Sequence, residues 1–328
     1  MNRKDFKPSY IDLCISGELA KRAARLESRL EKCDICPRNC GVNRLRGEMG
    51  YCNSAAKPIV ASYCAHFGEE PAISGSRGSG TIFFGNCNMA CAYCQNYQIS
   101  QNPFCQKNNQ VSIEELAGFM LQLQQMDCHN INLVSPTHFI AQIVPAINLA
   151  SQRGLKLPIV YNTNGYDSPG TLVELDGIIS VYLPDIKYSS NQMSQRFSDA
   201  QNYVENSRAA ILEMYRQTGG LVLDEGVAIK GVLIRHLVLP DDIGGSEDSL
   251  KWLAYNIGKG VALSLMSQYY PAHHAGRYRE ISRPITRDEY FRAFKVAKQL
   301  GFKQIFAQQM ESPGVYLPDF NCEKPFGG

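Results

Sequence analysis

The sequence predicts an α/β protein: a partial (β/α)6-type barrel preceded by a cysteine-rich extension. From residue 81 onward, short apolar runs with strand character alternate with amphipathic helical segments. Several of these runs are almost continuously apolar, which is typical of a parallel sheet with both faces covered. Six or seven such units in a chain of 328 residues favour a partial or full barrel over a short doubly wound sheet.

The expected elements follow one another in regular order. Strands are expected over residues 81–86, 130–136, 157–165, 177–187, 227–240, 261–271 and 302–308. Helices are expected over residues 17–31, 112–126, 139–154, 168–175, 191–218, 246–258 and 285–301. Ser112 and Glu115 form a capping box at the start of one helix. Polar residues follow most of the strands, and in barrels of this kind the active site lies at the carboxyl ends of the strands.

Residues 1–75 are expected to form an N-terminal helix and metal-binding segment, and residues 76–328 the barrel. The segment carries a C-x2-C-x3-C-x11-C motif made of Cys33, Cys36, Cys40 and Cys52. Four thiols in a glycine-rich loop can close a tetrahedral zinc site or hold an iron–sulfur cluster. The spacing leaves both a structural and an electron-relay role open. Glu69 and Glu70 come just before the barrel; a solvated loop is expected there, and a place at the substrate opening is the alternative.

The composition excludes several classes of function. A formal net charge of +2 argues against a broad basic surface for nucleic acid. No apolar run reaches the roughly 18 residues that a membrane span needs, and the first residues, MNRKDFKPSY, lack the apolar core of a signal peptide. We therefore expect a cytoplasmic protein with no nucleic-acid or membrane partner. In that reducing compartment disulfides are rare, so the seven of the 12 cysteines that fall in two clusters are expected to bind metal or do redox work.

The stretch GNCNMACAYCQN, residues 85–96, follows the first predicted barrel strand and contains Cys87, Cys91 and Cys94. Four thiolates close a structural zinc or an ordinary iron–sulfur site, whereas three leave one coordination place open. A cuboidal cluster held by three thiolates has a further iron free to bind a small molecule. A zinc loop and a set of buried free cysteines are the alternatives that the spacing alone leaves open.

This C-x3-C-x2-C motif, with Tyr93 before its last cysteine, resembles the motif of the radical S-adenosylmethionine (SAM) superfamily. The resemblance implies that Cys87, Cys91 and Cys94 hold a 4Fe–4S cluster whose unique iron binds the amino and carboxylate groups of SAM. It implies an enzyme in which the cluster reductively cleaves SAM to a 5′-deoxyadenosyl radical for hydrogen abstraction. By the same similarity, Tyr93 is a cofactor-binding residue.

Two further motifs are similar to those of the pyruvate formate-lyase activating enzyme group. Residues 162–165, Asn-Thr-Asn-Gly, stand where that group has Asp-Thr-Asn-Gly, and Asp185-Ile-Lys187 matches its Asp-x-Lys. The similarity implies that Lys187 contacts the SAM carboxylate and that Asp185 contacts its amino group or a nearby cation. It makes Arg235 a candidate for a SAM or substrate carboxylate, and Asn164 a further candidate for SAM.

Two positions depart from that group's pattern. Asn162 replaces an acid, which puts a monovalent cation site of the activating-enzyme type in doubt. The usual Gly-Gly-Glu at the end of the second strand is replaced by SPTH, residues 135–138. Ser135 and Thr137 are expected either to hydrogen-bond the SAM amino group or only to cap the turn and the helix that follows.

From about Cys33 to Gln308, the chain is similar to PflX-type proteins, which are pyruvate formate-lyase activating enzyme-like. This similarity implies an activating-enzyme-like oxidoreductase with a protein substrate, a glycyl radical enzyme or another polypeptide. An electron donor such as flavodoxin or ferredoxin is implied as well. The alternatives are a radical SAM enzyme that acts on a small molecule or modifies a protein residue, and a non-catalytic iron–sulfur electron-transfer or zinc protein.

Overall fold

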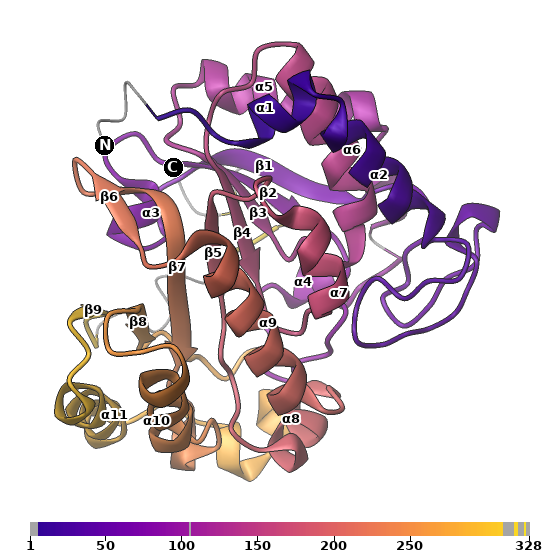
Figure 1. Ribbon diagram of the computed structural model, residues 1–328. Helices are drawn as coiled ribbons and strands as arrows, with labels where there is room; N and C mark the ends of the chain where they lie inside the picture. Colours follow the sequence, from indigo (N-terminus) through magenta and orange to yellow (C-terminus); the bar gives the residue numbers. More distant parts are fainter. Residues whose placement is uncertain (1–5, 105, 311–317, 321–324, 326–328) are drawn as a thin grey trace.

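The computed structural model describes residues 6–104, 106–310, 318–320 and 325. Within these residues the chain forms a curved nine-stranded sheet with helices around its outer side (Figure 1). Along the sheet the strands follow the order β1-β2-β3-β4-β5-β7-β8-β9, and β6 pairs with β7 beside this path. Every helix in the described residues is too short or too polar to span a bilayer.

Each predicted strand and helix is present, but most are shorter than predicted, and β1, β6, α1, α3 and α4 were not predicted. The strands are β1 (Val60–His66), β2 (Ser79–Phe84), β3 (Ile131–Val134), β4 (Ile159–Thr163), β5 (Val181–Pro184), β6 (Val222–Asp224), β7 (Val227–Leu237), β8 (Ala262–Met266) and β9 (Gln304–Ala307). The α-helices are α1 (Tyr10–Ile15), α2 (Glu18–Ser28), α3 (Pro71–Ser74), α4 (Tyr97–Ser100), α5 (Ile113–Gln125), α6 (Ile140–Gln152), α7 (Pro169–Leu172), α8 (Asn191–Ser198), α9 (Tyr203–Thr218), α10 (Ser246–Asn256) and α11 (Arg287–Leu300).

The parallel part of the sheet is the one that the sequence predicts. The strands β2, β3, β4, β5, β7, β8 and β9 run parallel to one another along the path, whereas β1 at the edge is antiparallel to β2. Every residue of β2, β4, β5 and β8 is buried, as expected for strands covered on both faces. In the described residues β9 and β1 do not pair, so the sheet is a partial barrel.

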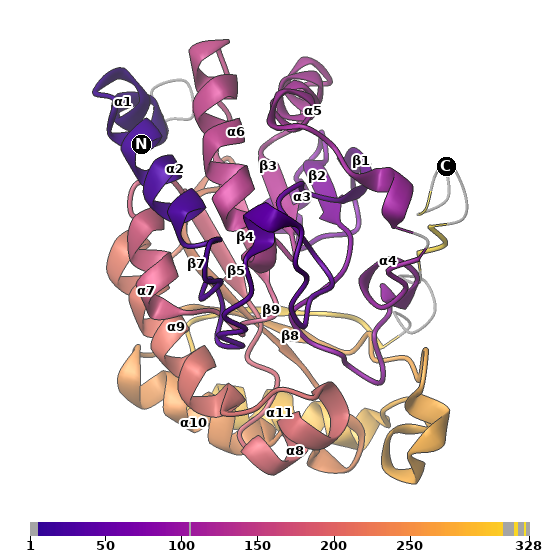
Figure 2. The ribbon, with the colours of Figure 1, turned by 90° about the vertical axis from the view of Figure 1, so that its right-hand side faces the viewer.

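The helices lie outside the strands and cover the convex side of the sheet (Figure 2). The predicted capping box at Ser112 and Glu115 begins α5, and a second one, Thr286 with Glu289, begins α11. Their apolar faces pack against the strands and against one another, and α2 adds buried Leu19 and Leu26 to the same core beside α6.

The N-terminal segment is more closely joined to the barrel than the sequence indicates. Strand β1 lies within residues 1–75 and pairs antiparallel with β2, so that Val60 faces Phe84 and His66 faces Ser79. The chain then turns through a short helix, α3. The sheet therefore begins at residue 60, and the segment after β1 lies at the amino end of the parallel strands.

At the carboxyl ends of the strands, the backbone takes conformations that turn polar residues toward a common centre. Asn86 after β2 and Ser135 after β3 have φ values of 62° and 56°, which residues other than glycine rarely adopt. Gly165 after β4 has a φ of 80°, and a Cβ atom there would lie 2.1 Å from the carbonyl oxygen of Asp185. Only glycine permits this close approach between the ends of β4 and β5.

Candidate functional site

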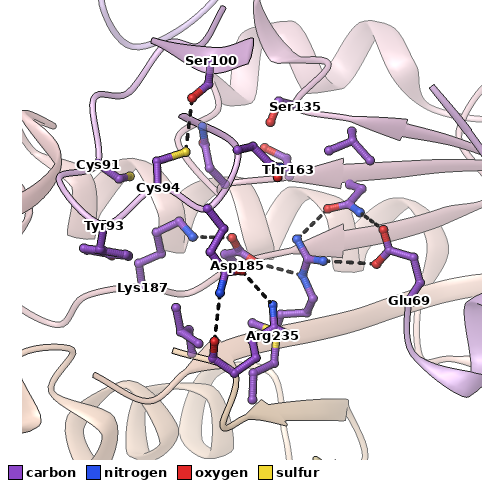
Figure 3. Close-up of a pocket in the computed structure, with 18 of the residues that line it drawn as sticks. Glu69, Cys91, Tyr93, Cys94, Ser100, Ser135, Thr163, Asp185, Lys187 and Arg235 are labelled. Carbon is purple, nitrogen blue, oxygen red and sulfur yellow. Dashed lines mark hydrogen bonds and ion pairs between the residues drawn. The ribbon is translucent and has the colours of Figure 1, made fainter. Parts of the chain in front are cut away.

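One cavity opens where the parallel strands end, and it extends into the barrel (Figure 3). It encloses about 1320 Å³ of space without protein atoms, part of which is open solvent. In Figure 3, Cys91 and Cys94 lie at one end and Glu69 lies at the other, with Asp185, Lys187 and Arg235 between them. The cavity therefore joins the three-cysteine loop to a cluster of charged residues inside the barrel.

All three cysteines of the predicted motif line this cavity. Each sulfur has a polar side chain beside it. The Asn164 amide donates to Cys87 Sγ at 3.4 Å, the Ser198 hydroxyl donates to Cys91 Sγ at 3.1 Å, and Ser100 Oγ lies 3.2 Å from Cys94 Sγ. Hydrogen bonds of this kind stabilise negative charge on sulfur and tune the reduction potential of iron–sulfur clusters.

The cysteine loop is fixed by its neighbours. The backbone amides of Ala90 and Ala92 donate to the carbonyls of Ser198 and Phe197 at the end of α8. Tyr93 is buried, and its hydroxyl lies 2.7 Å from that of Tyr188. The loop thus keeps its shape through contacts of its backbone and of Tyr93, which leaves the three sulfurs directed to the cavity.

Burial raises the pKa of the Cys87 thiol to about 12 and that of Cys91 to about 11, because a thiolate there loses its hydration. The neighbouring thiols add to both effects. In the described residues, no group of three or more His, Cys, Asp or Glu side chains is arranged to hold a single metal ion. Three thiols on one cavity wall, each beside a polar side chain, nevertheless form a donor set that suits a cluster of several irons.

Asp185 and Lys187 lie next to the cysteine loop, after β5. Lys187 Nζ is 2.5 Å from Asp185 Oδ2, and both side chains are almost fully buried. Burial alone favours the neutral amine, but Asp185 and Cys91 outweigh it, so the pKa of Lys187 is raised. Burial likewise opposes ionisation of Asp185, but Arg235 and Lys187 prevail and lower its pKa. Both residues are therefore charged at neutral pH.

Arg235 on β7 is held by three protein acceptors. Its Nε donates to Asp185 at 2.8 Å, and its Nη2 donates to Asn162 at 2.5 Å. Its Nη1 lies 3.5 Å from Glu69 Oε2. Glu69 in turn accepts from the amides of Asn132 and Asn162 at 3.1 and 3.0 Å. Arg235 thus joins the residues after β5 to an acidic segment that precedes the barrel.

The structure places most of the predicted SAM-binding residues at this cavity. Tyr93, Ser135, Asn164, Asp185, Lys187 and Arg235 line it. Thr137 is the exception, because its buried hydroxyl donates to Asp167 Oδ1 at 2.8 Å. Asp167 also accepts from Tyr161 and Thr163. Thr137 does not line the cavity, and its hydroxyl caps neither the turn nor α6; it supports the end of β4 from behind.

Cys33, Cys36, Cys40 and Cys52 come together around a second, much smaller cavity. Arg38 and Arg44 lie beside them, and the buried Arg44 donates to the carbonyls of His138 and Ala55. Four thiols are the kind of donor set that binds zinc or an iron–sulfur cluster, although here they are not arranged to hold a single metal ion. The structure places the four cysteines around one small cavity, and the metal site itself stays a prediction.

The four-cysteine segment also contacts the three-cysteine loop. Arg38 Nε donates to the carbonyl oxygen of Asn88 at 2.9 Å, and its guanidinium lies 3.4 Å above the ring of Tyr51. The Asn86 amide donates to the carbonyl of Asn53 at 2.9 Å. Both ends of the loop segment around Cys87 are therefore fastened to the N-terminal segment.

Sequence reasoning missed two residues of the site and favoured the wrong surroundings for two more. Ser100 and Ser198 belong to no motif, and Ser198 reaches Cys91 only because α8 ends beside the loop. Glu69 and Glu70 were expected in a solvated loop rather than at a substrate opening; in the structure both line the cavity, with Glu70 buried and the Glu69 side chain only 11% exposed. Two consecutive acids just before Pro71 were the available signal, but their burial depends on how β1 pairs with β2.

Comparisons with known proteins give limited similarity. No protein-family model matches the chain. The uncharacterized protein MJ0674 of Methanocaldococcus jannaschii is 28% identical over 307 residues, which cover 92% of this chain and 82% of that protein.

Solved structures overlap only in part. A structure of native anSMEcpe with bound AdoMet aligns with 72% of this chain at 12% identity and a TM-score of 0.44, and the alignment spans 62% of its own length. Methylornithine synthase (PylB) aligns with 74% of this chain and 72% of its own at 14% identity and a TM-score of 0.43. The description of the site therefore depends on the residues of this chain.

Proposed function

We propose that this protein is a radical SAM enzyme whose 4Fe–4S cluster is held by Cys87, Cys91 and Cys94. One observation carries the proposal: three thiols line the cavity at the carboxyl ends of parallel strands, beside a buried Asp185–Lys187 pair. A fourth cysteine ligand would leave no iron for SAM, and within the described residues no fourth cysteine lines this cavity.

When bound, the cluster and SAM supply one-electron cleavage of a carbon–sulfur bond, which yields a 5′-deoxyadenosyl radical for hydrogen abstraction. The side chains of this chain bind and orient the reactants. Lys187 and Asp185 complement the carboxylate and the amino group of SAM's methionyl end. Asn164, Ser198 and Ser100 hold hydrogen bonds on the three sulfurs. Tyr93 covers one wall and limits access of water.

Electron paramagnetic resonance of the reduced protein tests this assignment. The protein is loaded anaerobically with iron and sulfide and reduced with dithionite, and spectra are recorded with and without SAM. Binding of SAM at the open iron is expected to change the g values of the cluster. A spectrum that does not change with SAM at saturating concentration would contradict the proposal, as would a normal cluster in a Cys87→Ala variant.

The substrate is proposed to be a polypeptide, such as a glycyl radical enzyme, with flavodoxin or ferredoxin as electron donor. The similarity to activating enzymes at residues 162–165 and at Asp185 and Lys187 supports this proposal. A rival is a small-molecule substrate, because the cavity continues past Asp185 and Arg235 to Glu69 and Glu70 and could hold one beside SAM. A stable glycyl radical doublet that forms only with a partner enzyme would support a polypeptide substrate. Conversion of a small molecule without such a doublet would support a small-molecule substrate.

A second metal is proposed at Cys33, Cys36, Cys40 and Cys52, either zinc or an iron–sulfur cluster. The shared cavity of the four thiols supports it, and their contact with the three-cysteine loop supports a role in holding that loop. Metal analysis of a Cys33→Ala/Cys36→Ala double variant tests it. Loss of zinc alone identifies zinc, and loss of about four irons per chain identifies a second cluster.

A further inference from the structure

The inner end of the cavity is formed by a segment that closes the amino end of the barrel. β1 runs antiparallel to β2 and ends at His66, which faces the first residue of β2. Glu69 and Glu70 follow directly, whereas Cys87 comes after the opposite end of β2. The two acids therefore approach the cavity from the side opposite the cysteine loop, as Figure 3 shows for Glu69.

This end of the cavity carries an excess of negative charge. Among the described residues that line the cavity, three are carboxylates, Glu69, Glu70 and Asp185, and two are cationic, Lys187 and Arg235. Lys187 is paired with Asp185, and Arg235 is shared between Asp185 and Glu69. The carboxylate of Glu70 has no ion-pair partner in the described residues within 4.0 Å, although it is only 9% exposed.

Acceptor atoms on separate elements are also left without hydrogen-bond donors there. In the described part of the chain, buried Glu70 Oε2 and Asn132 Oδ1 on β3 have no partner. The hydroxyl of Ser264 on β8 is near enough to Glu70 to lower the pKa of that carboxyl, although neither Ser264 Oγ nor Glu70 Oε2 makes a hydrogen bond of standard geometry. Ser264 lies directly across from Arg235 in the sheet, so these atoms belong to the same part of the barrel. Buried unsatisfied acceptors of this kind cost about 1–3 kcal/mol each, unless a ligand supplies the donors.

We propose that this inner subsite, formed by Glu69 and Glu70 on the cavity wall with Asn132 and Ser264 buried in the same part of the barrel, binds a protonated nitrogen of the substrate, an ammonium or a guanidinium. Such a group brings one positive charge and several N–H donors, which matches the one excess carboxylate and the unpartnered oxygen of Glu70. An anionic substrate group would meet three carboxylates, and a neutral amide would leave the charge of Glu70 unpaired. Because the subsite belongs to the same cavity, the proposal rests on the proposed function and specifies its substrate class.

The environment of the two acids agrees with this role. Burial raises the pKa of both Glu69 and Glu70, and Arg235 offsets only part of the effect. A bound cation would stabilise the ionised form that burial disfavours. With its nitrogen held at this end, a substrate would extend past Arg235 and Asp185 toward the cysteine loop, where the hydrogen atom would be taken.

Binding of small cations to the full-length protein tests the subsite without dithionite or SAM. The probes are n-butylammonium and n-propylguanidinium, with 1-pentanol as the neutral match and butyrate as the anionic match. A peptide arm uses acetyl-Gly-Lys-Gly-amide against the same peptide with norleucine. Dissociation constants come from ligand-observed nuclear magnetic resonance. The cations are expected to bind at least about tenfold more tightly than their matches.

Variants locate the binding to Glu70. Glu70→Gln is expected to weaken binding of the cations about tenfold or more. Glu70→Asp keeps the charge but has a shorter side chain, and it is expected to weaken binding of the cations as well. Glu247→Gln changes an exposed acid on α10 and should leave the affinity unaltered. Circular dichroism confirms that each variant is folded. Equal binding of 1-pentanol, or unchanged binding by both Glu70 variants, would overturn the proposal.

The small-cation and peptide probes, together with an assay of 5′-deoxyadenosine formation, distinguish the kind of substrate and separate failure of the subsite from failure of the proposed function. Binding of n-butylammonium without the lysyl peptide supports a small amine as substrate, and preference for the peptide supports a lysyl or arginyl side chain. If 5′-deoxyadenosine forms from SAM but no cation binds, the subsite proposal fails by itself. If cations bind but no 5′-deoxyadenosine forms, the proposed function fails and the subsite remains as a binding site.

Discussion

Arg235 donates from Nε to Asp185 Oδ1 at 2.8 Å, and the two residues also form a β-bridge beyond the end of β5. The contact therefore closes the gap between β5 and β7, which pair directly at only two positions. It holds Lys187 beside the cysteine loop and Glu69 at the opposite end of the cavity. One buried ion pair thus sets the relative positions of both ends of the proposed site.

Replacement of Asp185 with Asn is expected to destabilise the protein by about 3–5 kcal/mol, because buried Lys187 loses its carboxylate and buried Arg235 keeps only the longer contact with Glu69. Asp176→Asn, which affects only an exposed ion pair with Arg216, should cost less than about 1 kcal/mol. Urea unfolding at neutral pH measures both. Similar values for the two variants would show that the buried pair does not organise the barrel.

The pH dependence of this contribution has a definite sign. The pKa of Asp185 is lowered in the folded state from its ordinary value of 3.8. Its stabilising effect is therefore complete above 3.8 and is lost as the pH falls through the lowered pKa. The stability difference between the parent protein and Asp185→Asn is thus expected to stay constant from pH 5 to pH 8.

Glu70→Gln is expected to stabilise the protein at pH 8, by about 1–3 kcal/mol, because a buried and unpaired carboxylate becomes neutral. The pKa of Glu70 is raised above its ordinary 4.5, so the folded state binds a proton more readily than the unfolded state does. Stability of the parent protein then falls as the pH rises from 4.5 through the raised pKa.

The advantage of Glu70→Gln should accordingly shrink as the pH is lowered toward 5. Glu69, Arg235 and Asp185 face the same group and stay unchanged in the variant. Thermal unfolding of both proteins over this pH range measures the trend. An advantage that is constant with pH, or a destabilised variant at pH 8, would contradict the view that Glu70 awaits a cationic partner.

Ser198→Ala is expected to lower the reduction potential of the cluster by roughly tens of millivolts, since a hydrogen bond of about 1 kcal/mol to a thiolate is lost. The hydrogen bond from Ser198 to Cys91 disperses negative charge, which favours the reduced cluster. Ser194→Ala, in the same helix and bonded only to backbone carbonyls, is the matched control. A redox titration followed by electron paramagnetic resonance gives both potentials. An unchanged reduction potential in Ser198→Ala would show that this hydrogen bond does not tune the cluster.

Arg38→Ala is expected to reduce the iron content after reconstitution, because the three-cysteine loop loses its hydrogen bond to the N-terminal segment. A hydrogen bond from a charged donor is worth about 1.5–3 kcal/mol. Arg46→Ala in the same segment changes an exposed side chain and should load normally. Iron and sulfide are measured per chain. Equal loading of the two variants would mean that the four-cysteine segment does not support the loop.

The repeating part of the fold could be predicted because local patterns determine it. Parallel strands that are covered on both faces give continuous apolar runs, and helices between them begin at capping boxes such as Ser112 with Glu115. Strand β1 was missed because it is a half-exposed edge strand without a clear apolar pattern. Its place in the sheet depends on pairing with β2, which the local sequence does not encode.

In the candidate site, too, residues in local sequence motifs could be predicted, and residues placed by tertiary packing could not. Cys87, Asp185, Lys187 and Asn164 could be found because each follows a strand in a recognisable motif. Ser198 and Glu70 could not, since α8 and the segment after β1 reach the cavity only through tertiary packing. Thr137 shows the opposite error, because a polar residue at a strand end can turn outward to a buried acid, here Asp167.

Formation of 5′-deoxyadenosine tests the central claim most directly. The reconstituted protein is incubated anaerobically with SAM and dithionite, and the nucleoside is measured by chromatography beside Cys94→Ala and Cys64→Ala variants. The account predicts 5′-deoxyadenosine from the parent protein and from Cys64→Ala, whose cysteine lies on β1 outside both cysteine groups, and none from Cys94→Ala. Absence of the nucleoside with the fully loaded parent protein, or equal formation by Cys94→Ala, would contradict it.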